Sequence, residues 1–294
     1  MPELPEIETL RRDLISLGLP GRRITDVRIF WDRSIQSPPP GEFRSLIRGR
    51  RICGIHRRGK YLSIDLDGDL SLVIHFRMTG GLTVSEEEAA QDPHDRVIFF
   101  LDTGSLVFHD TRKFGRMVLT KEPERILDSL GPEPFDPALT PELFFSRHTS
   151  RKRALKALLL DQGFIAGLGN IYADESLFAA GLHPLIPSNT LDRPASENLL
   201  RCIREVLDRG IRNRGTSLGD GESNFSSSGR YGRNASSLQV FRRTGKPCPR
   251  CSAPVERIIV AQRSTHFCPV CQPLLMKTPE HATLYEGRRF WCFP

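Results

Sequence analysis

The 294-residue chain lacks several features that would assign it to common classes of protein. It has no run of eighteen apolar residues, which a membrane-spanning helix requires. Its opening, Met1-Pro2-Glu3-Leu4-Pro5-Glu6, is acidic and has no long apolar stretch, so it does not read as a signal peptide. No glycine-rich loop ends in Lys-Ser or Lys-Thr, so the sequence predicts no nucleotide cofactor. We therefore expect a cytoplasmic protein with no membrane partner.

Positive charge, by contrast, is abundant. The chain has 42 Lys and Arg against 35 Asp and Glu, a formal net charge of +7. Many arginines stand in short clusters such as Arg22-Arg23, Arg57-Arg58 and Arg242-Arg243. This balance favours a polyanionic partner such as nucleic acid, although a basic soluble enzyme has the same charge. Charge by itself leaves both interpretations open.

Cysteine is sparse except near the end of the chain, where four of the seven form two close pairs. Sixteen residues separate the two Cys-x2-Cys pairs, a spacing typical of two knuckles that hold zinc in a tetrahedron of thiolates. With all four positions filled by protein, no position remains for a reactive water, so the ion is structural. The sequence predicts one structural Zn²⁺ held by Cys248, Cys251, Cys268 and Cys271.

The first residues place a proline amine beside a carboxylate once Met1 is removed. An α-amino group titrates near 8, so part of it is neutral at physiological pH and can attack an electrophilic carbon. Glu3 can deliver or remove a proton there. The same residues also fit an ordinary helix start, where Pro2 sets the entry angle and Glu3 and Glu6 complement the positive end. Locally, both interpretations stand.

Hydrophobic periodicity divides the rest of the chain. Apolar residues at helical spacing from Ile7 to Leu17 predict a first helix that ends at Gly18, and a period of two between residues 24 and 119 predicts antiparallel strands. Two hairpins are expected among these strands, one that turns at Asp67-Gly68 and one that turns at 102–105. Breakers in 131–137 predict a linker, and helical patterns follow it. The helices are expected after an N-terminal cap at Thr140, from Ser150 to Asp161, over 171–180 and over about 195–213. Gly215–Ser237 is expected to form a flexible loop.

Four further sites have both a functional and a structural interpretation. Lys60 follows Arg57-Arg58-Gly59, so it is either a presented amine or a solvated surface lysine. His75 and Arg77 end a strand on the face opposite Phe76 and Met78, which a polar outer face also explains. Asn170 follows Gly-Leu-Gly at a helix start that suits a phosphate or a plain turn. Arg263 lies near a hairpin turn between the cysteine pairs, where it faces a phosphate or only solvent.

Six motifs in one order resemble the formamidopyrimidine-DNA glycosylase and endonuclease VIII family of base-excision repair enzymes, and the first branch more closely. The resemblance spans about residues 2 to 273, and Leu4-Pro5 after Pro2-Glu3 is the glycosylase form. The motifs are Pro2-Glu3-Leu4-Pro5-Glu6, Gly59-Lys60, His75-Phe76-Arg77-Met78-Thr79-Gly80, Arg112-Lys113-Phe114-Gly115, Leu160-Asp161-Gln162 with Gly167-Leu168-Gly169-Asn170-Ile171-Tyr172, and Gln262-Arg263-Ser264-Thr265-His266-Phe267-Cys268.

The resemblance implies an α+β multidomain fold. Its parts are an N-terminal helix with an antiparallel β-sandwich, a helical helix-two-turn-helix domain, and a C-terminal zinc-finger β-hairpin. Damaged double-stranded DNA is the implied partner, and the protein is expected to be a monomer. The expected boundaries are 1–130 for the catalytic helix and sandwich, 131–139 for the linker, 140–237 for the helix-two-turn-helix domain, 238–273 for the zinc finger and 274–294 for a C-terminal extension.

The implied activity is removal of oxidised purines, 8-oxoguanine and formamidopyrimidines, followed by strand cleavage. The Pro2 nitrogen attacks C1′ and forms an iminium adduct, Glu3 protonates the ring oxygen, and β,δ-elimination follows. By resemblance, Pro2, Glu3, Lys60 and Arg263 are catalytic. Expected DNA contacts are His75, Met78, Arg112, Phe114, Lys156, Asn170, Glu175 and Arg263, with Met78, Arg112 and Phe114 filling the gap left by the flipped nucleotide.

Two alternatives remain beside this reading: an endonuclease VIII-like enzyme for oxidised pyrimidines, and a zinc-dependent DNA-binding protein without catalysis, as retention of Met1 would produce. By the resemblance, the region 216–237 corresponds to the loop that covers the flipped base. Its sequence departs from the family pattern, so its contacts and the lesion preference stay unassigned. The extension 274–294 continues past the usual end and is expected to be a disordered tail. A bacterial cytoplasm, with action at the nucleoid, is the expected location.

Overall fold

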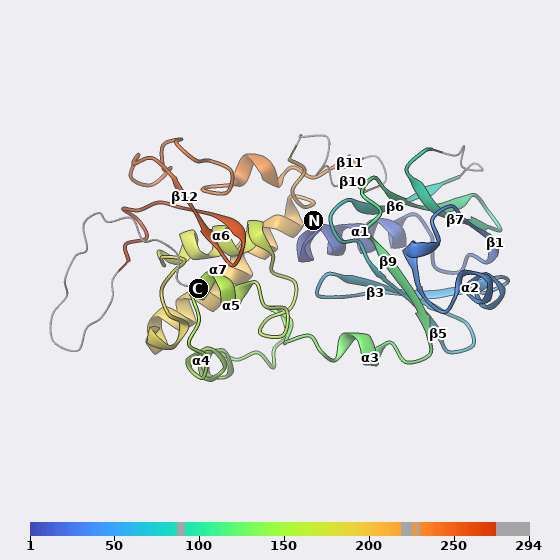
Figure 1. The fold of residues 1–294 in the computed structure, drawn as a ribbon, viewed down its shortest axis with the longest axis horizontal. Helices are drawn as coiled ribbons and strands as arrows, with labels where there is room; N and C mark the ends of the chain where they lie inside the picture. The colour runs from blue at the N-terminus through green and yellow to red at the C-terminus, as the bar shows by residue number, and fades with distance from the viewer. Residues whose placement is uncertain (87–91, 219–225, 228–229, 275–294) are drawn as a thin grey trace. The chain divides into compact units, whose positions relative to one another are not determined.

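The computed structural model describes residues 1–86, 92–218, 226–227 and 230–274. They belong to two compact units, each assembled from three separate segments of the chain (Figure 1). Unit 1 comprises Met1–Glu133, Ile165–Leu168 and Leu207–Ser237, and unit 2 comprises Pro134–Phe164, Gly169–Val206 and Leu238–Pro294. The division falls within the expected linker, and it differs from the expected boundaries because parts of 140–237 cluster with unit 1.

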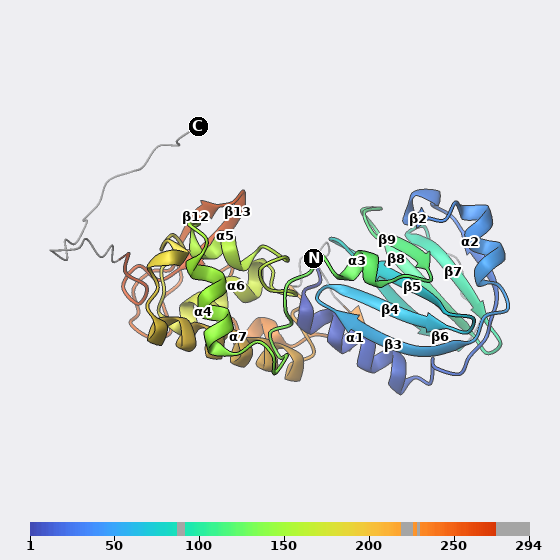
Figure 2. The same ribbon diagram turned by 90° about the horizontal axis from the view of Figure 1, so that it is seen from below.

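The first helix of unit 1, α1 (Leu4–Ser16), confirms the predicted amphipathic segment. It begins three residues earlier than the apolar pattern because Pro5 suits its first turn and the Glu6 carboxylate accepts the Glu3 N–H at 2.8 Å. It ends before Gly18, whose φ of +68° favours glycine. Inside unit 1 the helix packs along β3 and β4 (Figure 2).

Two sheets make up the β-sandwich of unit 1. One has the strand order β1-β7-β8-β6 and the other β2-β9-β5-β4-β3, with every neighbouring pair antiparallel except β2 and β9. Both predicted hairpins are confirmed, as β4–β5 and β7–β8. The strands are β1 Ile24–Ile29, β2 Ile35–Ser37, β3 Ile52–Arg58, β4 Tyr61–Leu66, β5 Leu70–His75, β6 Gly80–Ser85, β7 Asp95–Leu101, β8 Ser105–Asp110 and β9 Arg116–Thr120.

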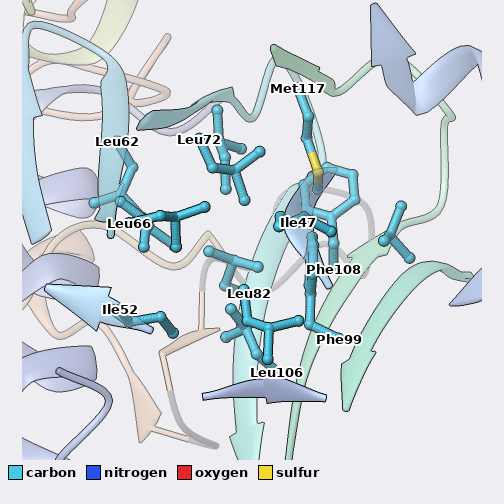
Figure 3. Packing of buried hydrophobic residues seen from close by; sticks show 14 of the residues in the cluster. Ile47, Ile52, Leu62, Leu66, Leu72, Leu82, Phe99, Leu106, Phe108 and Met117 are labelled. Atoms are coloured by element: carbon cyan, nitrogen blue, oxygen red, sulfur yellow. The ribbon is translucent and has the colours of Figure 1, made fainter. Parts of the chain in front are cut away.

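The core of unit 1 lies between these sheets and beneath the helices. Alternate residues of the strands point inward, as period-two patterning requires, and α1 and α2 (Pro40–Ile47) add apolar side chains to the same cluster. Phe108 and Phe99 are completely buried next to Leu82 and Ile47 (Figure 3). Burial of so many apolar side chains stabilises the sandwich, and it fixes the positions of the strand ends and of the loops that connect them.

Unit 2 is mainly helical, and the predicted cap at Thr140 is confirmed: its hydroxyl accepts the Leu143 N–H at 3.2 Å. The predicted helix from Ser150 to Asp161 is wrong in extent. It begins only at Leu155, because Ala154 pairs with Pro187 in a β-bridge. The helices of the chain after β9 are α3 Glu124–Leu127, α4 Pro141–Thr149, α5 Leu155–Leu159, α6 Asn170–Ala180 and α7 Arg193–Arg212, with short 3-10 turns at Ser188–Thr190 and Asn234–Ser237. A further 3-10 turn, Asp32–Ser34, lies between β1 and β2.

A hairpin of β12 (Glu256–Val260) and β13 (Arg263–Phe267) carries the cysteine knuckles. Its turn residues Ala261 and Gln262 both have positive φ, as a two-residue turn between right-twisted strands requires. The α+β fold class is confirmed by these parts together. No helix among the described residues has the length and apolarity to cross a bilayer.

The predicted loop 215–237 contains two short strands, β10 (Ser226–Ser227) and β11 (Arg230–Tyr231), which pair with each other. Its residues 219–225 and 228–229 lie outside the described part of the chain, as do residues 275–294 of the extension. The prediction of a loop throughout 215–237 is therefore wrong at β10, β11 and the 3-10 turn Asn234–Ser237. Its remaining part at 219–225 and 228–229, like the predicted disordered tail after Leu274, lies outside the described residues.

Candidate functional site

The N-terminal residues are buried in unit 1. Pro2 is buried, and Glu3 is only 2% exposed. The Leu4 N–H donates to the carbonyl of Gly167 at 3.1 Å, so the segment 165–168 seats the start of the helix. A Cβ at Gly167 would lie 2.6 Å from the Leu4 side chain, and its φ is +92°, so only glycine allows this approach.

Charged groups of both signs act on the terminal amine. Burial lowers the pKa of the Met1 amine, Glu3 and Glu6 oppose that shift, and Lys60 and Arg112 reinforce it. A larger neutral fraction is what a nucleophilic amine needs near pH 7. The structure thus brings together Glu3, Lys60 and Arg112, although more than a hundred positions separate the first of them from the last.

Glu6 is a residue whose role the sequence did not reveal. Its carboxylate accepts the Glu3 N–H at 2.8 Å and the Thr216 N–H at 2.7 Å. It therefore ties the N-terminus to the segment that leads into the expected base-covering loop. From the neighbouring residues alone, Glu6 could be interpreted only as part of a helix start, because Thr216 is 210 positions away in the sequence.

Lys60 is 5% exposed, so the solvated surface lysine is the wrong one of its two interpretations. The turn before it is held by Glu133, which accepts the Gly59 N–H at 2.6 Å and pairs with Arg57 at 2.8 Å and Arg58 at 3.2 Å. The turn needs Gly59, whose φ is +55°. Both arginines of this basic run are thus paired with carboxylates, Arg58 with Glu133 and Arg57 with Glu133 and, at 3.3 Å, with Glu8.

His75 closes strand β5 next to this site. Its Nδ1 accepts the Arg77 N–H at 3.0 Å, and its ring lies nearly perpendicular to that of Tyr61, with 4.6 Å between the two ring centroids. Burial, followed by the cations Arg77 and Lys60, lowers the pKa of His75 to about 4. The ring is therefore neutral at pH 7 with its proton on Nε2, which makes it a hydrogen-bond donor without a charge.

The predicted strand alternation stops at His75. Arg77 has a φ of +55°, so the chain turns, and Arg77 does not share a strand face with His75 as predicted. The turn presents half-buried Met78. In the loop after β8, Arg112 lies with its guanidinium 4.9 Å from the centre of the Phe114 ring, which is 45% exposed.

In unit 2, Asn170 begins α6 and its Nδ2 donates to the Ser264 carbonyl at 2.8 Å. The hydrogen bond fixes the N-terminus of α6 against the residue that follows Arg263, and Arg263 is exposed at the start of β13. An exposed guanidinium beside a helix N-terminus suits an anion.

Lys156 and Glu175 do not lie where direct contact with DNA requires them. Lys156 is 0% exposed and pairs with Asp174 at 2.6 Å, while Glu175 is 1% exposed. The Glu175 carboxylate accepts the backbone N–H groups of Gln239, Val240 and Phe241. The expectation of DNA contacts for Lys156 and Glu175 is therefore corrected: both support unit 2 from inside, because a charge buried this deeply needs an internal partner.

The four cysteines converge at the ends of the hairpin. Their Sγ atoms lie within 4.8 Å of one another, with Cys248 and Cys271 at 3.8 Å and Cys251 and Cys268 at 3.4 Å. A tetrahedron with zinc–sulfur bonds of about 2.3 Å has edges of about 3.8 Å, so the donor set fits one zinc ion. The predicted structural zinc site is confirmed by this geometry together with the match of residues 245–274 to the zinc finger found in FPG and IleRS.

Two further family models match the chain: the formamidopyrimidine-DNA glycosylase N-terminal domain over residues 1–117 and the H2TH domain over residues 130–221. The chain belongs to the formamidopyrimidine-DNA glycosylase family. The formamidopyrimidine-DNA glycosylase of Protochlamydia amoebophila is 45% identical over 92% of this chain and 99% of its own length. That of Moorella thermoacetica is 47% identical over 88% of this chain and 94% of its own.

Solved structures of formamidopyrimidine-DNA glycosylases have the same fold. A complex of the Lactococcus lactis enzyme with DNA containing an abasic site has a TM-score of 0.86 and 35% identity, and covers 92% of this chain and 99% of its own. The Thermus thermophilus enzyme has a TM-score of 0.83 and 40% identity. The match covers 92% of this chain and 98% of that enzyme. The predicted relationship to the formamidopyrimidine-DNA glycosylase branch is confirmed.

Proposed function

We propose that this formamidopyrimidine-DNA glycosylase uses the amine of Pro2, released by removal of Met1, as its nucleophile. The enzyme is a base-excision-repair DNA glycosylase for oxidised purines, and damaged double-stranded DNA is its partner. The observation that carries the proposal is the burial of the terminus beside Glu3, Lys60 and Arg112. Burial lowers the pKa of the Met1 amine, and Pro2 itself is buried in the same surroundings, where burial favours the neutral, nucleophilic form of an amine.

The neutral Pro2 nitrogen attacks C1′ of the damaged nucleoside, and the bond from C1′ to the base breaks with its electron pair going to the base. The N–H proton of Pro2 is transferred to the departing base, which leaves neutral. Glu3 donates a proton to the ring oxygen as the sugar opens, which leaves an iminium between Pro2 and C1′. The positive iminium acidifies the C2′ proton. Loss of that proton expels the 3′ phosphate, and a second elimination expels the 5′ phosphate. Hydrolysis of the iminium then frees Pro2. Strand cleavage by these two eliminations is the lyase activity typical of the family, and we propose it for this chain.

The remaining predicted residues hold the substrate. Lys60, Asn170, Arg263 and the neutral ring of His75 are proposed to bind phosphates next to the lesion. Hydrogen-bond donors and cations of this kind hold the DNA backbone without reading its base sequence. Met78 and Phe114 are proposed to wedge the base stack, and Arg112 to pair with the orphaned base. Exposure of Phe114, an apolar ring, supports its part in this wedge.

Structures of relatives support oxidised purines as substrates, and one of them points to a second substrate class. One Lactococcus lactis complex contains Fapy-dG DNA, with 35% identity and a TM-score of 0.85. Another contains DNA with an oxidised pyrimidine, at the same identity and TM-score. We therefore propose oxidised pyrimidines as a secondary substrate class of this chain. A monomer in the bacterial cytoplasm, acting at the nucleoid, completes the proposal.

Borohydride trapping tests the nucleophile. Duplexes that contain 8-oxoguanine, formamidopyrimidine, thymine glycol or an abasic site are incubated with the wild type, Pro2→Gly and Glu3→Gln, with Pro5→Ala as a control that alters the helix start but keeps the Pro2 amine. We expect Pro2→Gly and Glu3→Gln to lower base excision by about 100-fold or more, and Pro5→Ala to keep it. Mass spectrometry of the native protein checks the terminus. Retained Met1, or no trapped adduct with any lesion, would reject the covalent mechanism.

A further inference from the structure

The two loops assigned to the wedge meet at one buried carboxylate. Asp110, the last residue of β8, is 0% exposed. One of its oxygens accepts the Thr79 hydroxyl and, at 3.2 Å, the Arg112 N–H. The other accepts the Gly115 N–H at 2.7 Å. Three donors from two separate loops therefore converge on a single side chain.

The link between the loops is direct. Thr79 follows Met78 in the loop between β5 and β6, and its hydroxyl oxygen also accepts the Arg112 N–H at 3.1 Å. The backbone of Arg112 is thus held by both Thr79 and Asp110. Charged acceptors make the stronger class of hydrogen bond, and a buried one is costly to leave unpaired.

A core ring supports the same loops from below. An added Cβ at Gly115 would lie 2.4 Å from Phe108 Cζ, and one at Gly80 would lie 3.2 Å from that atom and 2.6 Å from the Phe76 carbonyl. Phe108 is fully buried in the sandwich core (Figure 3). Both loops therefore approach Phe108 as closely as glycine permits, with Asp110 joining them above it.

The loop backbones are strained and need such support. Arg77 has a φ of +55° and Lys113 a φ of +61°, conformations that residues with a Cβ rarely adopt. They persist only where surrounding contacts determine them. Asp110 itself is fixed, because its carbonyl accepts the Nε of buried Arg96 at 2.7 Å. The carboxylate is thus anchored to the sheet and orders both loops.

We infer that Asp110 is a positioning residue for base excision, with Thr79 as its partner. It presets the Met78 loop and the Arg112–Phe114 loop as one wedge before DNA binds. The inference rests on the proposed wedge role of Met78, Arg112 and Phe114. A wedge that is already ordered does not lose conformational entropy when it enters the stack, so more of the contact energy is available to hold the nucleotide out.

The test compares four variants. Asp110→Asn replaces one carboxylate oxygen by an amide NH2 group. That group is a donor, and it faces a backbone N–H or hydroxyl that the carboxylate accepts in the wild type. Thr79→Val removes the hydroxyl at nearly constant shape, whereas Thr79→Ser keeps it. Thr83→Val, at an exposed position of β6, makes the same change away from the loops. The readouts are kcat/KM on a lesion duplex, 2-aminopurine fluorescence beside the lesion as a measure of unstacking, and borohydride trapping on single-stranded abasic DNA, which has no stack to open.

We expect Asp110→Asn and Thr79→Val to lower duplex kcat/KM by about tenfold or more and to reduce the unstacking signal. Thr79→Ser and Thr83→Val should stay within about twofold of the wild type, as should single-strand trapping by all four variants. If Asp110→Asn does not fold, Thr79→Val decides the outcome. Unchanged duplex excision by Thr79→Val would overturn the inference, and so would an equal loss on single-stranded DNA. Failure of the wild type to form any adduct would instead reject the proposed function.

Discussion

Buried charges in this protein fall into two classes at the residue scale. Glu3 and Lys60 lie close to the terminal amine, where they change its protonation. Lys156 and Asp174 are both 0% exposed as side chains and neutralise each other at 2.6 Å. The second Asp174 oxygen accepts the N–H of His266 at 2.9 Å, so this carboxylate is satisfied on both sides. Burial alone therefore does not mark a catalytic residue; its partners do.

Removal of the Lys156 ammonium should destabilise the protein. Lys156→Met leaves the Asp174 carboxylate without its cation, and breaking a buried pair in this way costs about 3 to 5 kcal/mol. Urea unfolding at pH 7 measures the loss. Lys152→Met, at an exposed position four residues earlier, is the control and should change stability by less than about 0.5 kcal/mol. Equal stability of the two variants would contradict the internal role of Lys156.

His75 should make stability depend on pH. Its pKa is lowered from 6.5 to about 4, so between these values the unfolded chain binds more protons than the folded one. The stability due to neutral His75 is complete above pH 6.5 and is lost as the pH falls towards 4, by at most about 1.4 kcal/mol per pH unit. The measurement is the free energy of unfolding of the wild type minus that of His75→Gln between pH 4 and 7.5. A difference that does not vary across this range would be evidence against the neutral ring.

At the scale of elements, the hairpin β12–β13 depends on contacts at both ends. The thiolates gather at one end, with Cys268 Sγ accepting the Cys271 N–H at 3.4 Å. Asn170 and Asp174 of α6 bind the backbone of β13 at Ser264 and His266. A two-stranded hairpin is marginal in water without such support. Zinc and helix α6 therefore determine together where Arg263 is presented.

Removal of zinc should release this hairpin while the β-sandwich persists. Chelation, or Cys268→Ser, removes a ligand set that contributes directly to folding, so we expect loss of the β12–β13 structure and at least about tenfold weaker DNA binding. Amide hydrogen exchange resolves the two regions, and fluorescence anisotropy reports binding. Cys202→Ser, which changes a buried cysteine outside the zinc cluster, is the control. Persistent protection of β12–β13 after chelation would argue against a structural role of the metal.

Net charge acts at the scale of the whole molecule. The formal charge of +7 attracts a polyanion, and each cation that contacts a phosphate releases about one counterion. Arg263 is exposed and Asn170 is uncharged, so the two proposed phosphate contacts differ in how salt affects them. Salt dependence can therefore separate a charged contact from a neutral one.

Arg263→Ala should weaken binding to every duplex and reduce the slope of log K against log salt by about 1. Asn170→Ala should weaken binding with an unchanged slope, because no cation is lost. Arg201→Ala, which removes an exposed arginine paired with Glu205 at 2.6 Å, is the matched control for loss of charge. Anisotropy titrations between 50 and 300 mM KCl, a range over which screening changes strongly, give the slopes. A wild-type slope for Arg263→Ala would contradict a phosphate contact.

Short-range patterns predicted most of the elements. The hairpin of β4 and β5, the cap at Thr140 and the paired Cys-x2-Cys knuckles each depend on residues within one turn or one strand pair, so their spacing is visible locally. The same reasoning failed at Ser150, where a β-bridge between Ala154 and Pro187 delays the helix. It failed again at Arg77, where a left-handed φ ends the strand alternation.

The sequence by itself determined the family, the zinc ligands and the candidate nucleophile, since each is written in contiguous motifs whose chemistry needs few neighbours. Only the tertiary structure decided which charged residues face the site and which are internal. Glu6 meets Thr216 from 210 positions away, and His266 meets Asp174 from 92. Lys156, Glu175 and Asp110 likewise acquire their roles from burial and from partners on other elements. Burial is a property of the packed chain, so no local pattern specifies it.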